Sequence, residues 1–133
     1  MKRTNLDYAA GLVRKAENDW KTASIGLDHG SPLDTICFHI QQTAEKLLKA
    51  LLAWHNVDYP LTHDLGDLLD LALPQFSGLE KFRKSLPGYT EFAIAMRYDD
   101  ALYPSRDETV EAFETVGRLR SIVHSLLPPE TRP

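Results

Sequence analysis

The chain has 133 residues, of which 43% are hydrophobic and 26% are charged, a composition typical of a single globular domain that can bury a core. Its formal net charge of −4 argues against broad, sequence-independent binding of nucleic acid, although a local basic groove is compatible with that sum. No apolar run approaches the about 20 residues that cross a bilayer, no signal peptide is recognised, and the single cysteine excludes an internal disulfide, so we expect a cytoplasmic protein.

Two long helices are predicted in the first part of the chain. The first spans Leu6–His29, with apolar residues along one side and Gly30 at the position where a C-terminal cap is expected. The segment Ser31-Pro32-Leu33-Asp34 then supplies a capping hydroxyl, a proline at the first helical position and an acid in the first turn. It predicts the start of a second helix that runs to about His55.

The middle of the chain predicts shorter elements. Thr62 is expected to cap a short third helix from His63 to about Leu73, which Pro74 ends. Residues 80–98 have a helical pattern that is interrupted at Pro87-Gly88, and they predict one kinked or broken fourth helix.

The last helix has the clearest start signal. Ser105-Arg106-Asp107-Glu108 is a capping box, in which the serine and glutamate side chains each accept a hydrogen bond from the other residue's backbone N–H. The helix that follows ends at Pro128-Pro129. Because no segment is typical of a strand, the chain predicts an all-α, up-and-down four-helix bundle with an additional short helix. One domain is expected over residues 1–133, with its core at about 6–127.

The second helix has a polar side and an apolar side. Its polar residues are spaced i, i+3, i+4 and i+7, which places them in one stripe: Gln42, Glu45, Lys46 and Lys49. The opposite stripe is apolar and consists of Ile36, Ile40, Ala44, Leu47 and Leu51. The polar stripe is compatible with a solvated face that carries i to i+4 pairs, or with a binding face whose lysines contact phosphate and whose amide contacts a base or ribose.

Four local motifs occur in an order that is more specific than any one of them. They are Phe38-His39-x-Gln41-Gln42-x-x-Glu45-Lys46-x-Leu48-Lys49-Ala50, Thr62-His63-Asp64-Leu65, Ala95-Met96-Arg97-Tyr98 and Tyr103-Pro104-Ser105. With these motifs in this order the chain resembles the HEPN domain family (higher eukaryote and prokaryote nucleotide-binding domains). The first helix also fits, and the resemblance covers nearly the whole chain, about Leu6 to Leu127.

The resemblance implies several properties. Family members are compact bundles that form homodimers, and many are encoded beside a small, separate nucleotidyltransferase in pairs that look like toxin–antitoxin systems. Some members are thought to bind nucleotides. Another branch consists of metal-independent ribonucleases, in which an Arg and a His with four to six residues between them act on RNA at the dimer interface.

Two further residues of these motifs are candidates for the site, each with two interpretations. His63 is compatible with a buried, structurally satisfied histidine or with a side chain that faces the polar stripe of the second helix. Arg97 is compatible with electrostatic closure of its helix end. Equally, its planar guanidinium suits a phosphate or Glu45.

The ribonuclease pattern is weak in this chain. No histidine follows Arg97 at the required distance, whereas Arg118 and His124 have five residues between them on the last helix. Their side chains project about 120° apart on a regular helix, which disfavours a shared site. The histidines form no close pair and Cys37 stands alone, so no metal site is expected.

We therefore expect a non-catalytic homodimeric module that binds nucleotide or RNA, partners a minimal nucleotidyltransferase, or both, without a metal or a cofactor. The expected ligand-binding residues are Gln42, Glu45, Lys46, Lys49, His63 and Arg97. The alternatives are a metal-independent ribonuclease that uses Arg118 and His124, and a purely structural protein-interaction domain.

Overall fold

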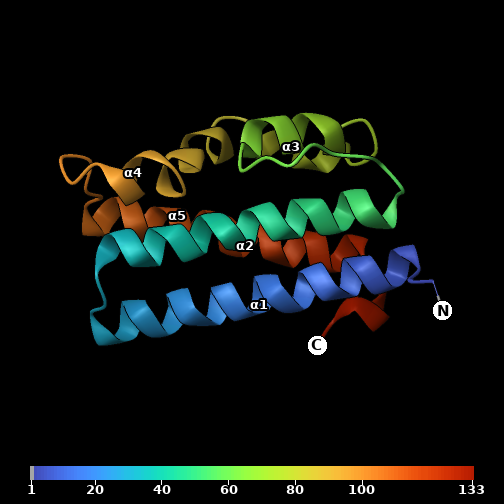
Figure 1. Ribbon diagram of the computed structural model, residues 1–133, viewed down its shortest axis with the longest axis horizontal. Helices are drawn as coiled ribbons and strands as arrows, with labels where there is room; N and C mark the ends of the chain where they lie inside the picture. The colour runs from blue at the N-terminus through green and yellow to red at the C-terminus, as the bar shows by residue number, and fades with distance from the viewer. Residues whose placement is uncertain (1) are drawn as a thin grey trace.

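The computed structural model describes residues 2–133, and within that range every regular element is a helix. Three are long: α1 (Asn5–His29), α2 (Leu33–Trp54) and α5 (Arg106–Leu126). Figure 1 shows that α1 and α2 run antiparallel, with α5 behind α2. The fourth position of the bundle is filled by the segment from α3 (Leu65–Ala72) to α4 (Ala95–Tyr98), which runs back along α2 on the side opposite α1. The predicted all-α, up-and-down bundle is confirmed.

The α1–α2 hairpin follows from two glycines. Gly30 has a φ of 73°, a left-handed conformation that favours glycine, and it caps α1 as predicted. A Cβ at Gly26 would lie 2.9 Å from Ile36 Cγ1, so a glycine there lets α2 begin close against α1. In this hairpin the polar side of α2 lies beside the middle of α1, where Asp19 contacts it.

The start of α2 differs from the prediction. Pro32 is the N-cap residue, and neither its side chain nor a local serine makes a capping bond. Instead, the backbone N–H of Leu33 donates to the hydroxyl of Tyr103, 3.0 Å away and 70 residues later in the sequence. The predicted cap at Ser31 was wrong because a distant side chain satisfies the first free N–H group.

The third helix begins two residues later than predicted. Asp64 is its N-cap, and its carboxylate accepts from the N–H of Asp67 at 3.0 Å. The hydroxyl of Thr62 accepts from the N–H of Asp64 instead, and so it organises the turn before the helix. Thr62 and Asp64 therefore each accept a hydrogen bond from a backbone N–H, and Asp64 is the one that caps the helix.

The fourth element over residues 80–98 is broken, as predicted, but its breaks do not lie at Pro87-Gly88 and most of it is 3₁₀ helix. The segment forms two 3₁₀ helices, η1 (Ser77–Phe82) and η2 (Leu86–Phe92), and then the single turn of α4. Pro87 lies in the first turn of η2, where a missing N–H group costs nothing, so it helps to start a helix rather than to kink one. These short turns still bury Leu79, Phe82 and Leu86.

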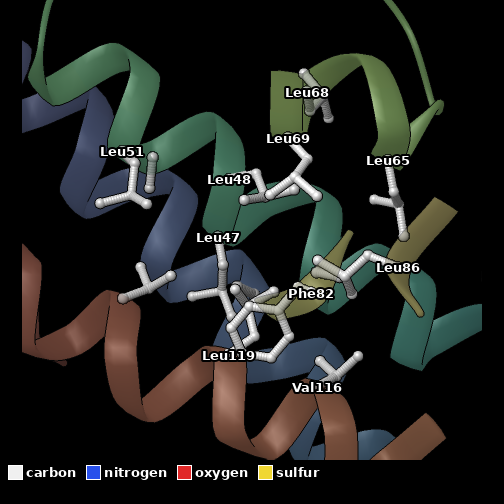
Figure 2. Packing of buried hydrophobic residues seen from close by; sticks show 14 of the residues in the cluster. Leu47, Leu48, Leu51, Leu65, Leu68, Leu69, Phe82, Leu86, Val116 and Leu119 are labelled. Carbon is white, nitrogen blue, oxygen red and sulfur yellow. The ribbon is translucent and has the colours of Figure 1, made fainter. Parts of the chain in front are cut away.

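The core lies between α1, α2, α5 and the segment that carries α3 and the 3₁₀ helices. The predicted apolar stripe of α2 is buried along its whole length, from Ile36 to Leu51. Figure 2 shows Leu47 beside Phe82 and Leu119, and Leu48 beside Leu69. Truncating such a leucine to alanine typically costs about 2–5 kcal/mol. This core fixes the rotation of α2, and therefore which of its side chains face outward.

The final helix starts at the predicted capping box. The Ser105 hydroxyl accepts from the N–H of Glu108, and the Glu108 carboxylate accepts from the N–H of Ser105. No helix among residues 2–133 is long and apolar enough to span a membrane.

Candidate binding face along α2

Asp19 of α1 organises one side of the outer face of α2. Its carboxylate, with only 12% of the side chain exposed, contacts Nδ1 of His39 at 2.8 Å and accepts a hydrogen bond from Nζ of Lys46. Both partners are on α2, seven residues or about two helical turns apart. A single carboxylate from α1 therefore holds a histidine and a lysine of α2 in place.

Glu45 organises the other side of the same face. Its side chain is 6% exposed, and its two oxygens contact Nζ of Lys49 at 3.1 Å and Nδ1 of His63 at 2.7 Å. His63 precedes α3, so this contact ties the α2–α3 loop to α2. The second carboxylate therefore also holds one lysine and one histidine.

Gln41 completes the second cluster. Its amide is fully buried, and Nε2 donates to Glu45 Oε1 at 3.2 Å and to the backbone carbonyl of His63 at 2.9 Å. Its Oε1 accepts from Nε2 of Gln42 at 2.7 Å. A buried amide with all of these contacts fixes the loop and the orientation of Glu45.

The predicted polar stripe therefore divides into two clusters. Lys46 turns toward α1, whereas Glu45 and Lys49 turn toward the loop before α3, and Gln42 lies between them on the helix. Each cluster contains one carboxylate and one lysine, so its net charge is zero with a neutral imidazole. The charges on this face are held in fixed positions by partly buried ion pairs.

His63 is not a buried histidine. Its side chain is 59% exposed, and its ring contacts Glu45, so it lies beside the polar residues of α2. The exposed position follows from its place in the loop, one residue before the Asp64 cap of α3.

Arg97 joins the face at the N-terminal end of α2. Its guanidinium carbon lies 4.0 Å from the centre of the Phe38 ring, a close cation–π contact. Phe38 is one helical turn before Gln42 on the same side of α2. Among residues 2–133 no carboxylate is within ion-pair distance of Arg97, so the pair with Glu45, one of the alternatives for this residue, does not form.

Arg118 and His124 lie at different places within one chain. Arg118 donates to the hydroxyl of Thr115 and lines a hollow beside Lys81. His124 contacts Glu17 through Nε2 and lines another hollow between α1 and α5. The second imidazole nitrogen of His124 is buried and has no hydrogen-bond partner among residues 2–133. A single protomer does not bring the two side chains into one site.

The one cysteine does not supply a nucleophile at neutral pH. Burial raises the pKa of the Cys37 thiol to about 11, and Sγ lies 3.3 Å from the hydroxyl of Thr109. Because the thiolate is the reactive form, Cys37 is an inert core residue. Residues 2–133 contain no group of three metal-ligating side chains.

Three residues that organise the face were not among the predicted site residues. Gln41 has a local signal, because it precedes Glu45 by one helical turn and can bond to it. Asp19 and His39 have none, since their contact joins two helices and depends on how α1 and α2 pack. The face therefore consists of Asp19, His39, Gln41, Gln42, Glu45, Lys46, Lys49 and His63, with Phe38 and Arg97 at one end.

Comparison with known protein families identifies the chain. The model of the HEPN domain matches residues 9–126, which contain every residue of this face. Comparisons with curated proteins and with solved structures gave no significant match. The chain belongs to the HEPN domain family.

Proposed function

We propose that this HEPN domain is a non-catalytic module that binds a nucleotide or RNA through the outer face of α2. The observation that supports this most strongly is the pair of clusters centred on Asp19 and Glu45, which hold two lysines and two histidines on one face. Gln42 lies between them, with an amide that suits a ribose or a base edge.

The fixed positions of the lysines suit a phosphate ligand. An ammonium group has three N–H donors, and each lysine uses one on its carboxylate, so donors remain for phosphate oxygens. Side chains that are already ordered lose less entropy when a ligand binds. Because each lysine is already paired with a carboxylate, we expect modest affinity that decreases with added salt.

Isothermal titration calorimetry with ATP, GTP and a short RNA tests this proposal. We expect wild type to bind at least one of them, and Lys46→Gln and Lys49→Gln to weaken that binding at least severalfold. Lys84→Gln is the matched control, because Lys84 is an exposed lysine near η2, outside the face. The absence of binding, or equal effects of all three variants, would contradict the proposal.

The domain acts as a homodimer in this proposal. Large apolar side chains are exposed on α4 and in the loop after it, and Tyr98 alone is 87% exposed. The exposed apolar residues of this segment are the surface proposed to dock a second copy: Ile94, Tyr98, Leu102 and Tyr103. Light scattering should show a dimer that Tyr98→Asp dissociates and Leu61→Asp leaves intact, since Leu61 is a fully exposed single residue in another loop.

The proposed partner is a minimal nucleotidyltransferase, in a system of the toxin–antitoxin type. It rests on the family membership, and a nucleotidyltransferase encoded next to this chain that co-purifies with it would support it. Co-expression without co-purification would contradict this part alone.

RNA cleavage would contradict the non-catalytic role. Purified protein incubated with tRNA in EDTA is expected to leave the RNA intact. Cleavage that His124→Ala abolishes would instead favour a metal-independent ribonuclease that combines Arg118 and His124 across a dimer.

A further inference from the structure

Three cations lie over aromatic rings on the side of the bundle formed by α1, α2 and α4. The guanidinium of Arg97 lies 4.0 Å from the centre of the Phe38 ring, and that of Arg3 lies 4.6 Å from the centre of the Tyr8 ring. Nζ of Lys49 lies 5.7 Å from the centre of the Tyr59 ring. Each pair combines a flat surface with a positive charge.

Two of the pairs share one side of α2. Phe38 and Lys49 are separated by eleven positions, which corresponds to a rotation of only about 20° and a rise of about 16 Å along the helix. Gln42 and the two carboxylate-centred clusters lie between them. The polar residues of the face are therefore bounded by an aromatic ring at either end.

The third pair, Arg3 with Tyr8, lies just beyond the end of the α2 face that carries Lys49. Tyr59 lines a hollow of about 600 Å³ between the start of α1 and the end of α2, and Tyr8 lines the same hollow. Its charged lining residues are Arg3, Lys15 and a single acid, Asp58. Two cations against one carboxylate give this hollow a positive balance in a chain whose net charge is −4.

We infer that these residues form one track for single-stranded nucleic acid, from Phe38 through the α2 face to Tyr59 and Tyr8. Proteins that bind single strands combine aromatic platforms on which bases stack with cations that follow the phosphates. Bases also stack on guanidinium planes, so Arg97 and Arg3 extend the platforms. The inference rests on the function proposed above and specifies its ligand.

The length and composition of the track favour an unpaired strand of about four nucleotides, near the lower end of known single-strand site sizes. A mononucleotide cannot reach both Phe38 and Tyr8, because the α2 face alone separates the first two platforms by about 16 Å. A duplex hides its bases from the rings, and a net charge of −4 disfavours the sequence-independent phosphate contacts on which duplex binding relies.

Fluorescence anisotropy with 5′-labelled oligoadenylates of one, two, four and eight nucleotides tests the track. We expect affinity to increase up to about four nucleotides and then to level off. We expect Tyr8→Leu and Tyr59→Leu each to weaken tetranucleotide binding about tenfold, with mononucleotide binding unchanged. A duplex of the same sequence should bind more weakly than either single-stranded RNA or single-stranded DNA.

Tyr89→Leu is the matched control, because Tyr89 lines a different hollow beside Glu108 and Glu111. Thermal melts of the three variants establish that each is folded. The track is overturned if the mononucleotide binds as tightly as the tetranucleotide, if duplex binds as tightly as single strand, or if Tyr8→Leu behaves like Tyr89→Leu. In these three cases the proposed binding at α2 still stands. If neither nucleotide nor oligonucleotide binds, both are wrong.

Discussion

The buried amide of Gln41 bonds to the backbone carbonyl of His63, 22 residues later, at 2.9 Å. The same Nε2 atom also donates to Glu45, which in turn contacts the His63 ring. One α2 side chain therefore fixes both the backbone of the α2–α3 loop and the carboxylate that orients Lys49. The position of half of the binding face depends on this amide.

Gln41→Ala should therefore destabilise the domain by about 1–3 kcal/mol, because it leaves the His63 carbonyl without its donor and removes one of the two contacts of Glu45 Oε1. Urea denaturation measures the change, with Gln75→Ala as the control, since Gln75 is exposed near the end of α3. Amide exchange at residues 62–65 should also accelerate. Equal stability of the two variants would show that the amide does not hold the loop.

The Asp19–Lys46 pair should contribute more to stability than an exposed ion pair. A double-mutant cycle with Asp19→Asn and Lys46→Met is expected to give a coupling free energy above about 1 kcal/mol, because the carboxylate is 12% exposed. The control cycle is Asp70→Asn with Arg83→Met, whose side chains are 60% and 48% exposed and should couple by less. Equal coupling in the two cycles would contradict the structural role assigned to Asp19.

Serines precede both α2 and α5, but only the one before α5 makes a capping bond. Ser105→Ala should lower the free energy of unfolding by about 1 kcal/mol, because it removes a capping bond. Ser31→Ala should have little effect, since Tyr103 meets the first N–H of α2 in its place. Denaturation midpoints of the two variants measure these changes. A larger loss of stability in Ser31→Ala than in Ser105→Ala would show that Ser31 caps α2 after all.

The thiol of Cys37 predicts a particular pH dependence. Its pKa is raised to about 11 in the folded chain, so above the pKa of the unfolded thiol the unfolded state binds fewer protons than the folded state. Stability should therefore be constant with respect to this group at neutral pH and decrease as pH rises from about 9 to 11. Cys37→Ala should remove that part of the decrease.

Alkylation measures the same group directly. Iodoacetamide at pH 8 should label Cys37 slowly in native protein and rapidly in urea, because only the thiolate reacts and the folded thiol stays protonated. Equal rates in the two conditions would contradict a buried thiol.

Local patterns in the sequence predicted the long helices well. The boundaries of α1 and α5 and the capping box at Ser105 depend on residues within one or two turns, which a single sequence displays. Between residues 77 and 98 the outcome depends on packing instead. Short 3₁₀ turns bury Phe82 and Leu86 in the core, and no hydrophobic periodicity in the sequence predicts these turns.

The same division holds for the candidate site. The spacing of Glu45 and Lys49 is a helical i to i+4 relationship, and their ion pair was predictable. Asp19 was not, because its partners are 20 and 27 residues away on another helix. For Arg97 the sequence left helix-end closure, a phosphate and Glu45 open, and its stacking on Phe38 was not predicted because it depends on where the single turn of α4 docks.

A titration of ¹⁵N-labelled protein with an RNA tetranucleotide, followed by heteronuclear NMR, reports directly on binding along α2. We expect shift changes to concentrate at Phe38, Gln42, Lys49 and Tyr59, together with the side-chain amide of Gln42. The opposing hollow on α5, around Arg118, should not respond. Changes confined to Arg118 and His124, or no changes at millimolar RNA, would contradict a binding face along α2.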